Sequence, residues 1–285
     1  MKGLSFYFCS IMFYNKDSCR WDMVNIIEID NLSYHKFNDI SLSFEKGLFY
    51  LIVGSNNSGK TTLFRIISSI IPTENTITCN NIILNDDNLM EYITNIGIVE
   101  RVNNNSFIYQ KVYDEMRYPL VNLGYSKKNI DKRINEILKL FNEEDILDKN
   151  ISDLTYSKKQ KLLIMISLLH QPNVLLIDSV LEIFDNYEKE NILKILSKLV
   201  KDGLTIINFT VSLNDINYCD RIVLLDDFKV IGEYLPKDVF LNDKVFYEHH
   251  IEIPFIIDLS VKLKMYDVVN KEYTSVKAMV DDIWP

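Results

Sequence analysis

Residues 48–71, LFYLIVGSNNSGKTTLFRIISSII, constrain the fold more than any other stretch of this chain. A continuous apolar run, typical of a buried strand, leads into a glycine-bounded loop, and an apolar helical pattern follows and ends at Pro72. The loop fits the pattern G-x-x-x-x-G-K-[ST] from Gly54 to Thr61, in the strand-loop-helix context that the pattern requires. Strand, loop and helix in this order predict an α/β fold.

The residue types of this loop suit phosphate binding. Backbone N–H groups of the loop and of the helix N-terminus can point at phosphate oxygens. Gly54 and Gly59 permit a close approach that a Cβ would block. Lys60 supplies a positive charge, and the Thr61 hydroxyl can bind Mg²⁺. The predicted contacts are Gly54, Ser55, Asn56, Asn57, Ser58, Gly59, Lys60, Thr61 and Thr62. The alternative, an ordinary Gly/Asn-rich turn, is disfavoured because the chain has only eight glycines.

Composition excludes several classes of function. The net charge of −9 and the absence of a long Lys/Arg block argue against a nucleic-acid partner. The four cysteines have neither zinc spacing nor a compact disulfide pattern, so we expect free thiols. No apolar run reaches the roughly 18 residues of a membrane span. Residues 1–22 are expected to be an N-terminal extension, with a peripheral membrane anchor as the alternative, because MVNIIEIDNLSY from Met23 resembles a domain start.

The rest of the chain predicts a mainly parallel sheet with helices on its faces. VLLID, 174–178, and LTIINF, 204–209, are continuous apolar runs typical of strands buried on both faces. The helix expected between them, 186–201, is closed by Gly203. Further expectations are strands in 26–53 and 76–100, helices in 111–150 and 161–170, an edge hairpin in 222–234, and a small separate unit in 236–285.

The run NVLLIDSVLEIFD, residues 173–185, carries one carboxylate, Asp178, to the end of a predicted buried strand. In a doubly wound sheet this strand and the one before Gly54 can be neighbours, so that Thr61 and Asp178 hold Mg²⁺ from two sides. An aspartate that caps the next turn is the alternative reading. Hydrolysis usually needs a second carboxylate beside the first, but the next residue is Ser179.

These residues resemble the ATP-binding subunits of ABC transporters, over nearly everything after residue 26. NIGIVERVNNNSFIYQKVYDEM, 95–116, and the tail LPKDVFLND with HHIEIPFIIDLSVKL resemble more narrowly the energy-coupling factor (ECF) importers. The resemblance implies ATP and Mg²⁺ as cofactors and a P-loop NTPase of the ABC type. Such a fold has a mainly parallel sheet core, an antiparallel β subdomain and a helical subdomain at about 111–170. The implied boundaries are 23–235 for this domain and 236–285 for a small C-terminal domain.

The resemblance also implies that several functional positions are altered. The Q-loop glutamine falls on Arg101, which cannot bind Mg²⁺. The catalytic glutamate falls on Ser179 and the H-loop histidine on Val211, whereas the D-loop aspartate is kept as Asp185. The signature Leu-Ser-Gly-Gly-Gln falls on Leu154, Thr155, Tyr156, Ser157 and Lys158.

No catalytic residue is identified. Serine cannot act as a general base near neutral pH without a basic partner, and valine has no hydrogen-bonding group. Glu182, the nearest other acid, lies three residues beyond the expected position.

Two aromatic residues and a histidine pair are further candidates. Tyr34 and Phe37 are both placed to stack on adenine, and each is equally well explained as core or surface. His249 and His250 lack further ligands for a metal and are interpreted as surface residues.

The implied function is the ATP-binding subunit of an ABC/ECF-type importer, peripheral on the cytoplasmic side of the membrane. Its partners would be a second ABC ATPase subunit, in a heterodimer, and integral membrane subunits docked around Arg101 and the helices at 111–150. Whether ATP is hydrolysed would depend on the sites that the two ATPase subunits form together. The alternatives are a non-hydrolysing, ATP-gated interaction or regulatory subunit, and a soluble ABC protein without a transporter.

Overall fold

The computed structural model describes residues 24–74 and 76–283. The predicted extension at 1–22 lies outside these residues, as do Cys9 and Cys19. The two described cysteines, Cys79 and Cys219, are free and buried.

The larger sheet has the strand order β10-β9-β3-β8-β7-β6. Its strands are β3 (Phe49–Val53), β6 (Ile96–Val99), β7 (Val174–Asp178), β8 (Thr205–Thr210), β9 (Arg221–Asp226) and β10 (Lys229–Tyr234). All neighbouring strands pair in parallel except β9 and β10, which form the expected antiparallel edge hairpin. Every residue of β3 and β8 is buried, which confirms the prediction of strands covered on both faces.

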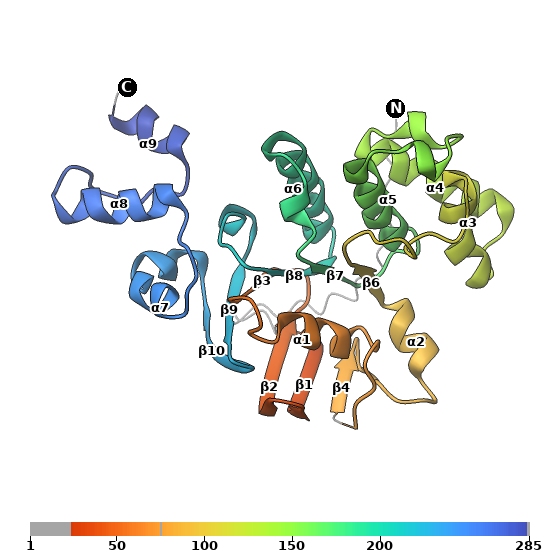
Figure 1. Cartoon of the computed structure of the whole chain (residues 1–285), viewed down its shortest axis with the longest axis horizontal. Coiled ribbons are helices and arrows are strands. Elements are labelled where there is room, and N and C mark those ends of the chain that lie inside the picture. The colour runs from red at the N-terminus through yellow and green to blue at the C-terminus, as the bar shows by residue number, and fades with distance from the viewer. Residues whose placement is uncertain (1–23, 75, 284–285) are drawn as a thin grey trace, which may run out of the picture.

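The smaller sheet is antiparallel, with the order β2-β1-β4-β5. Its strands are β1 (Asn25–Tyr34), β2 (Phe37–Glu45), β4 (Thr76–Cys79) and β5 (Ile82–Ile83). Helix α1 (Lys60–Ile67) lies between the two sheets (Figure 1), and its Leu63, Phe64 and Ile66 join the buried cluster formed by both sheets. Burial between two sheets therefore fixes the orientation of the helix that follows the phosphate loop.

Helices lie on the other side of the larger sheet. They are α3 (Val112–Asn122), α4 (Lys127–Phe141), α5 (Tyr156–Leu168) and α6 (Asn186–Lys201). Helices α5 and α6 pack on the strands of this sheet, and α3 and α4 pack on these two helices. The buried side of α4 consists of Ile130, Ile134, Leu138 and Phe141, which is the apolar pattern that predicted this helix. No described helix is long and apolar enough to cross a membrane.

The strands expected in 76–100 and the helix expected from 161 are present, but two features of these segments were not predicted. Residues 76–100 contain helix α2 (Leu89–Thr94) between the strands, held by a hydrogen bond of 2.8 Å from the Tyr92 hydroxyl to the Ile67 carbonyl. Helix α5 begins at Tyr156, earlier than the apolar pattern from 161 indicates, because Thr155 caps its N-terminus.

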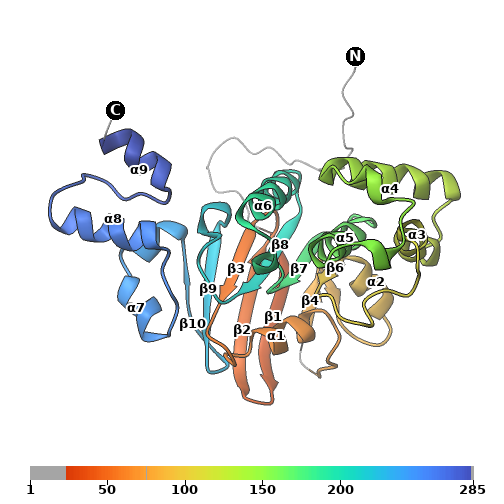
Figure 2. The same cartoon turned by 45° about the horizontal axis from the view of Figure 1, so that its top comes forward.

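The C-terminal segment forms α7 (Asp243–Glu248), α8 (Phe255–Met265) and α9 (Val276–Ile283), on the opposite side of the molecule from α3 and α4 (Figures 1 and 2). Phe246 and Ile257 belong to the main buried cluster, and the Phe246 ring lies 5.2 Å from the Tyr234 ring. Only the last part, around Tyr273 and Met279, has a separate small cluster. The first half of the predicted C-terminal domain thus packs on the main core.

Candidate nucleotide-binding site

The predicted phosphate loop connects β3 to α1, as the motif requires. Gly54 approaches the Leu225 backbone so closely that a Cβ would lie 2.3 Å from the Leu225 carbonyl oxygen. Gly59 caps α1 with a φ of 105°, a conformation that favours glycine. Both glycines are therefore required by the backbone geometry of the loop.

Lys60 is the buried charge of this loop. Its Nζ donates hydrogen bonds to the backbone carbonyls of Gly54, at 2.7 Å, and Ser55, at 2.8 Å. Burial lowers the pKa of Lys60, and the nearby carboxylates of Asp178 and Glu182 oppose this shift. An anion at the loop would provide a stronger partner for the ammonium than the two carbonyls do.

Thr61 and Asp178 meet although they lie on different elements. The Thr61 hydroxyl donates to Asp178 Oδ2 at 2.9 Å. The expectation of adjacent strands is wrong, because β8 lies between β3 and β7. The side chains still converge because Thr61 stands in the first turn of α1 and Asp178 ends β7. A hydroxyl and a carboxylate are oxygen ligands that suit Mg²⁺, which usually takes few protein ligands and fills its coordination with phosphates and water.

A cavity of about 580 Å³ opens beside this pair. It is lined by Lys36, Asn56, Asn57, Gly59, Lys60, Thr61, Thr62, Ser179, Val211 and Phe228. Tyr34 is not among the lining residues, and Phe37 is buried behind them. Lys36 and Phe228 are lining residues that the sequence interpretation missed. The signal for Phe228 was available, because DDFK places phenylalanine where a two-residue hairpin loop usually has glycine.

The positions of the implied catalytic groups border the same cavity. Ser179 has a φ of 53°, and its hydroxyl donates to Asp178 Oδ1 at 3.3 Å. Arg101 donates from Nε to the Ser179 carbonyl at 2.7 Å. Val211 is 42% exposed and lines the cavity. The structure therefore brings together the positions of the Q-loop, the glutamate and the histidine, but no group among Arg101, Ser179 and Val211 can accept a proton from water near neutral pH.

Glu182 is engaged next to this site. Its Oε1 accepts a hydrogen bond of 2.5 Å from the Thr210 hydroxyl, while its Oε2 is buried and has no hydrogen-bond partner. This contact fixes the carboxylate on the end of β8. Glu182 is not among the residues that line the cavity, although its carboxylate is close enough to Lys60 to favour the charged form of that side chain.

The signature segment begins helix α5. Leu154 is buried, and the Thr155 hydroxyl accepts a hydrogen bond of 3.3 Å from the Lys158 N–H. The Ser157 hydroxyl donates to Glu188 at 2.5 Å, and Lys158 Nζ donates to Glu143 at 3.0 Å.

Tyr156 is exposed, and its hydroxyl donates to the Val102 carbonyl at 3.4 Å. The polar side chains of the signature segment are therefore bonded within their own chain.

Asp185 and His249 also have structural partners. Asp185 caps helix α6 by accepting a hydrogen bond of 2.8 Å from the Glu188 N–H. His249 lies 2.8 Å from Asp226, and Asp226 accepts a hydrogen bond of 3.5 Å from the Ser55 hydroxyl. His249 is therefore half-buried against Asp226 rather than a free surface residue, whereas His250 is exposed as expected.

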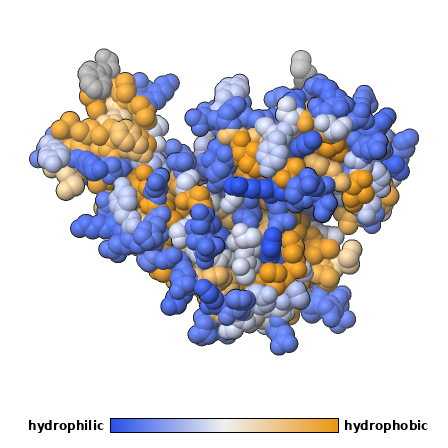
Figure 3. All heavy atoms as spheres, viewed as in Figure 1, coloured by the Kyte–Doolittle hydropathy of each residue, from blue (hydrophilic) through white to orange (hydrophobic). Residues whose placement is uncertain are grey.

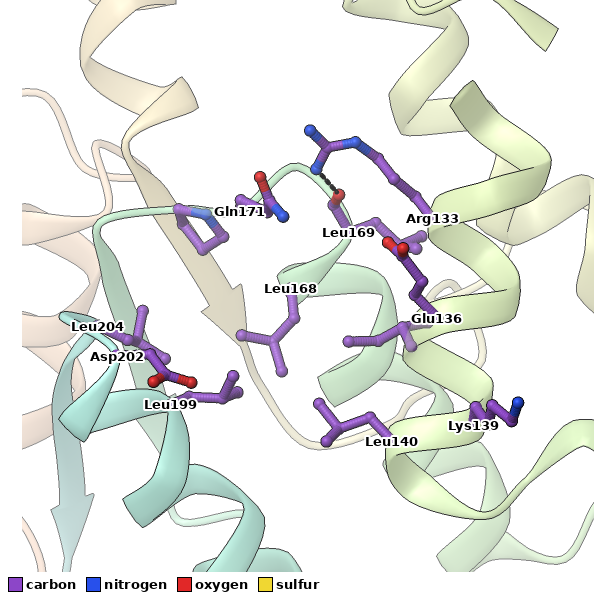
Figure 4. A pocket seen from close by; sticks show the side chains of 12 residues that line it. Arg133, Glu136, Lys139, Leu140, Leu168, Leu169, Gln171, Leu199, Asp202 and Leu204 are labelled. Carbon is purple, nitrogen blue, oxygen red and sulfur yellow. Dashed lines mark hydrogen bonds between the residues drawn. The ribbon is translucent and has the colours of Figure 1, made fainter. Parts of the chain in front are cut away.

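A second cavity, of about 450 Å³, lies at the other end of the parallel strands (Figure 4). Leu140 of α4, Leu168 at the end of α5, and Leu199 of α6 project into it. Arg133 borders it and donates a hydrogen bond of 3.0 Å to the Leu169 carbonyl. This cavity is apolar and far from the phosphate loop, so it does not belong to the nucleotide site.

Known proteins resemble this chain in sequence and in fold. Residues 37–182 match the family described as ABC transporter. The chain is 30% identical to the energy-coupling factor transporter ATP-binding protein EcfA of Pediococcus pentosaceus, over 82% of this chain and 87% of that protein. It is also 30% identical to EcfA1 of Mesomycoplasma hyopneumoniae strain J, over 90% of this chain and 93% of that protein.

Solved structures show the same fold. The structure of cbiO1 from Clostridium perfringens, described as part of the ABC transporter complex cbiONQ, aligns with a TM-score of 0.70 at 27% identity, over 79% of this chain and 94% of that one. The dimeric ATP-binding cassette MJ0796, bound to ADP and Pi, aligns with a TM-score of 0.65 at 26% identity, over 74% of this chain and 98% of that one. The chain belongs to the ABC transporter family of ATP-binding proteins.

Proposed function

We propose that this chain binds ATP with Mg²⁺ at the phosphate loop and serves as the ATP-binding subunit of an importer of the energy-coupling factor type. The observation that carries the proposal is the convergence of Lys60, Thr61 and Asp178 beside one cavity. Lys60 would bind the outer phosphates, and the loop N–H groups would orient them. Thr61 and Asp178 would hold Mg²⁺, which when bound neutralises part of the phosphate charge.

The proposed partners are a second ABC ATPase subunit and integral membrane subunits, which would place the chain on the cytoplasmic side of the membrane. The relatives named above are subunits of transporters, and one related cassette is a dimer. Apolar surface over helices α8 and α9 (Figure 3), with Phe255, Met265 and Val276 exposed, supports contact with another protein. A heterodimer is favoured because a homodimer would carry Ser179 and Val211 in both sites.

A second candidate function is supported by the same substitutions. Since Ser179 and Val211 leave the attacking water without a base, the chain would act by binding ATP without hydrolysing it. ATP binding would then drive association with the partner, and hydrolysis, if any, would occur at the partner's catalytic position.

Equilibrium binding of a fluorescent ATP analogue with Mg²⁺ tests the proposal. Lys60→Ala should weaken binding by about 100-fold or more, because it removes a buried charge-assisted contact to phosphate. Lys201→Ala, which removes an exposed lysine at the end of α6, is the matched control and should bind like the unmodified chain. Equal binding by the unmodified chain and Lys60→Ala would refute the assignment of the phosphate loop.

A further inference from the structure

Strands β9 and β10 are joined directly by a hairpin turn (Figure 1). This tight turn carries a large aromatic side chain, Phe228. Asp226 pairs with Lys229, so Asp227 and Phe228 form a two-residue hairpin loop. Their φ angles are 40° and 61°, in the left-handed region. Such loops favour Asn-Gly or Asp-Gly, because glycine adopts positive φ without strain. A phenylalanine in this conformation is strained, and such strain is concentrated at functional sites.

The Phe228 ring is held against the phosphate loop. The backbone N–H of Phe228 donates a hydrogen bond to the Ser58 carbonyl at 2.9 Å. The ring meets Phe37 edge to face, with centroids 5.0 Å apart. A Cβ added to Gly59 would lie 2.9 Å from an atom of each ring, so this glycine also makes room for the aromatic pair. Phe228 is half-buried and lines the nucleotide cavity, whereas Phe37 supports it from behind.

Lys36 also borders the cavity at this point. Its ammonium lies over the Phe228 ring, 5.3 Å from the centroid. A cation–π contact at an exposed site favours association by about two- to fivefold. A nucleobase stacked on an aromatic ring contributes about 5- to 150-fold. A base entering the cavity would therefore displace the ammonium from the ring.

We propose that Phe228 is the surface on which the base of the bound nucleotide stacks, in place of the expected Tyr34. The inference rests on the proposed nucleotide binding and adds the position of the base. Tyr34 contacts His35, with ring centroids 6.4 Å apart, and is absent from the cavity lining. Stacking reads the face of a base rather than its edge, so the ligand class is nucleoside triphosphates with little discrimination among bases.

Phe228→Gly tests the inference, because glycine suits the positive φ of the turn and leaves the hairpin intact. Binding of Mg-ATP and of inorganic tripolyphosphate is measured in the full chain. ATP affinity should fall by roughly tenfold or more, and tripolyphosphate affinity should not change. Phe228→Tyr keeps a stacking ring and should retain ATP affinity. Tyr34→Ala should cost less ATP affinity than Phe228→Gly.

Two results would overturn the inference. Unchanged ATP affinity in Phe228→Gly would show that the base does not use this ring. An equal loss of ATP and tripolyphosphate affinity would show that the ring supports the phosphate loop instead. Failure of the unmodified chain to bind either ligand would overturn the proposed function itself, and the inference with it.

Discussion

The phosphate loop and the signature segment both begin a helix, α1 and α5, yet their polar groups have different partners. In the phosphate loop, Lys60 and Thr61 border a cavity and bond to groups that a ligand could replace. In the signature segment, Ser157 and Lys158 bond to Glu188 and Glu143 of the same chain. The first arrangement suits an external ligand, and the second stabilises the fold of the helical region.

Because the phosphate loop is suited to a ligand, we expect hydrolysis to be limited by the glutamate and histidine that Ser179 and Val211 replace. Ser179→Glu together with Val211→His should raise ATPase turnover by roughly 10²–10⁴-fold, the usual contribution of a positioned base. Both side chains line the cavity, so the new groups would face the nucleotide. Turnover is measured by phosphate release at saturating Mg-ATP.

Two further variants sharpen this prediction. Adding Lys60→Ala to the repaired chain should abolish the gain. Adding Tyr156→Gly should increase the gain in turnover further, because the signature segment of the partner copy must approach the γ-phosphate. Unchanged turnover in both the double and the triple variant would contradict the assignment of Ser179 and Val211.

For the signature segment we expect that breaking its contacts lowers the stability of the fold and leaves ATP binding unchanged. Glu143 is buried and accepts from Lys158 at 3.0 Å and Lys161 at 2.8 Å. Glu143→Gln should lower the free energy of unfolding by about 2–3 kcal/mol, less than for a fully buried pair because Lys161 keeps Glu188 at 3.1 Å. Chemical denaturation measures the loss, and the exposed neighbour variant Glu144→Gln is the control. A measurable loss of ATP affinity in folded Glu143→Gln would contradict the separation of the two regions.

The smallest expected effect concerns pH. Burial lowers the pKa of Lys60 despite the carboxylates of Asp178 and Glu182, so its ammonium loses its proton below the pH typical of an exposed lysine. Because only the charged form attracts phosphate, ATP affinity should begin to fall at a pH below the ordinary pKa of lysine as the pH is raised from neutral. Lys60→Arg stays charged in this range and should not show the fall. A flat profile in the unmodified chain, or the same fall in Lys60→Arg, would contradict the role of Lys60.

Much of the parallel core could be predicted from the sequence. The runs that form β3, β7 and β8 are mainly apolar because both of their faces are covered, and the glycine spacing of the phosphate loop marks the turn after β3. The order of the strands in the sheet could not be predicted, because the pairing of strands far apart in the chain leaves no pattern in the local sequence. Helix α2 was missed because it is short and depends on the contact of Tyr92 with α1.

The site could be predicted where its residues lie close together in the sequence, and not where the fold brings distant residues together. Lys60 and Thr61 belong to one motif, whereas Phe228 enters the cavity from a hairpin far along the chain. His249 was expected to be a surface residue, and only the packing of α7 on the core brings it to Asp226. The partners of Ser157 and Lys158 likewise come from other elements.

The central claim is that this chain binds ATP but does not activate the attacking water. ATP binding and ATPase turnover, measured in one preparation of the unmodified chain and of Lys60→Ala, test it most directly. We expect ATP binding that Lys60→Ala removes, and turnover that is equally low in both proteins. Robust turnover in the unmodified chain that is abolished in Lys60→Ala would contradict the claim, because it would show that a catalytic base exists elsewhere in the site.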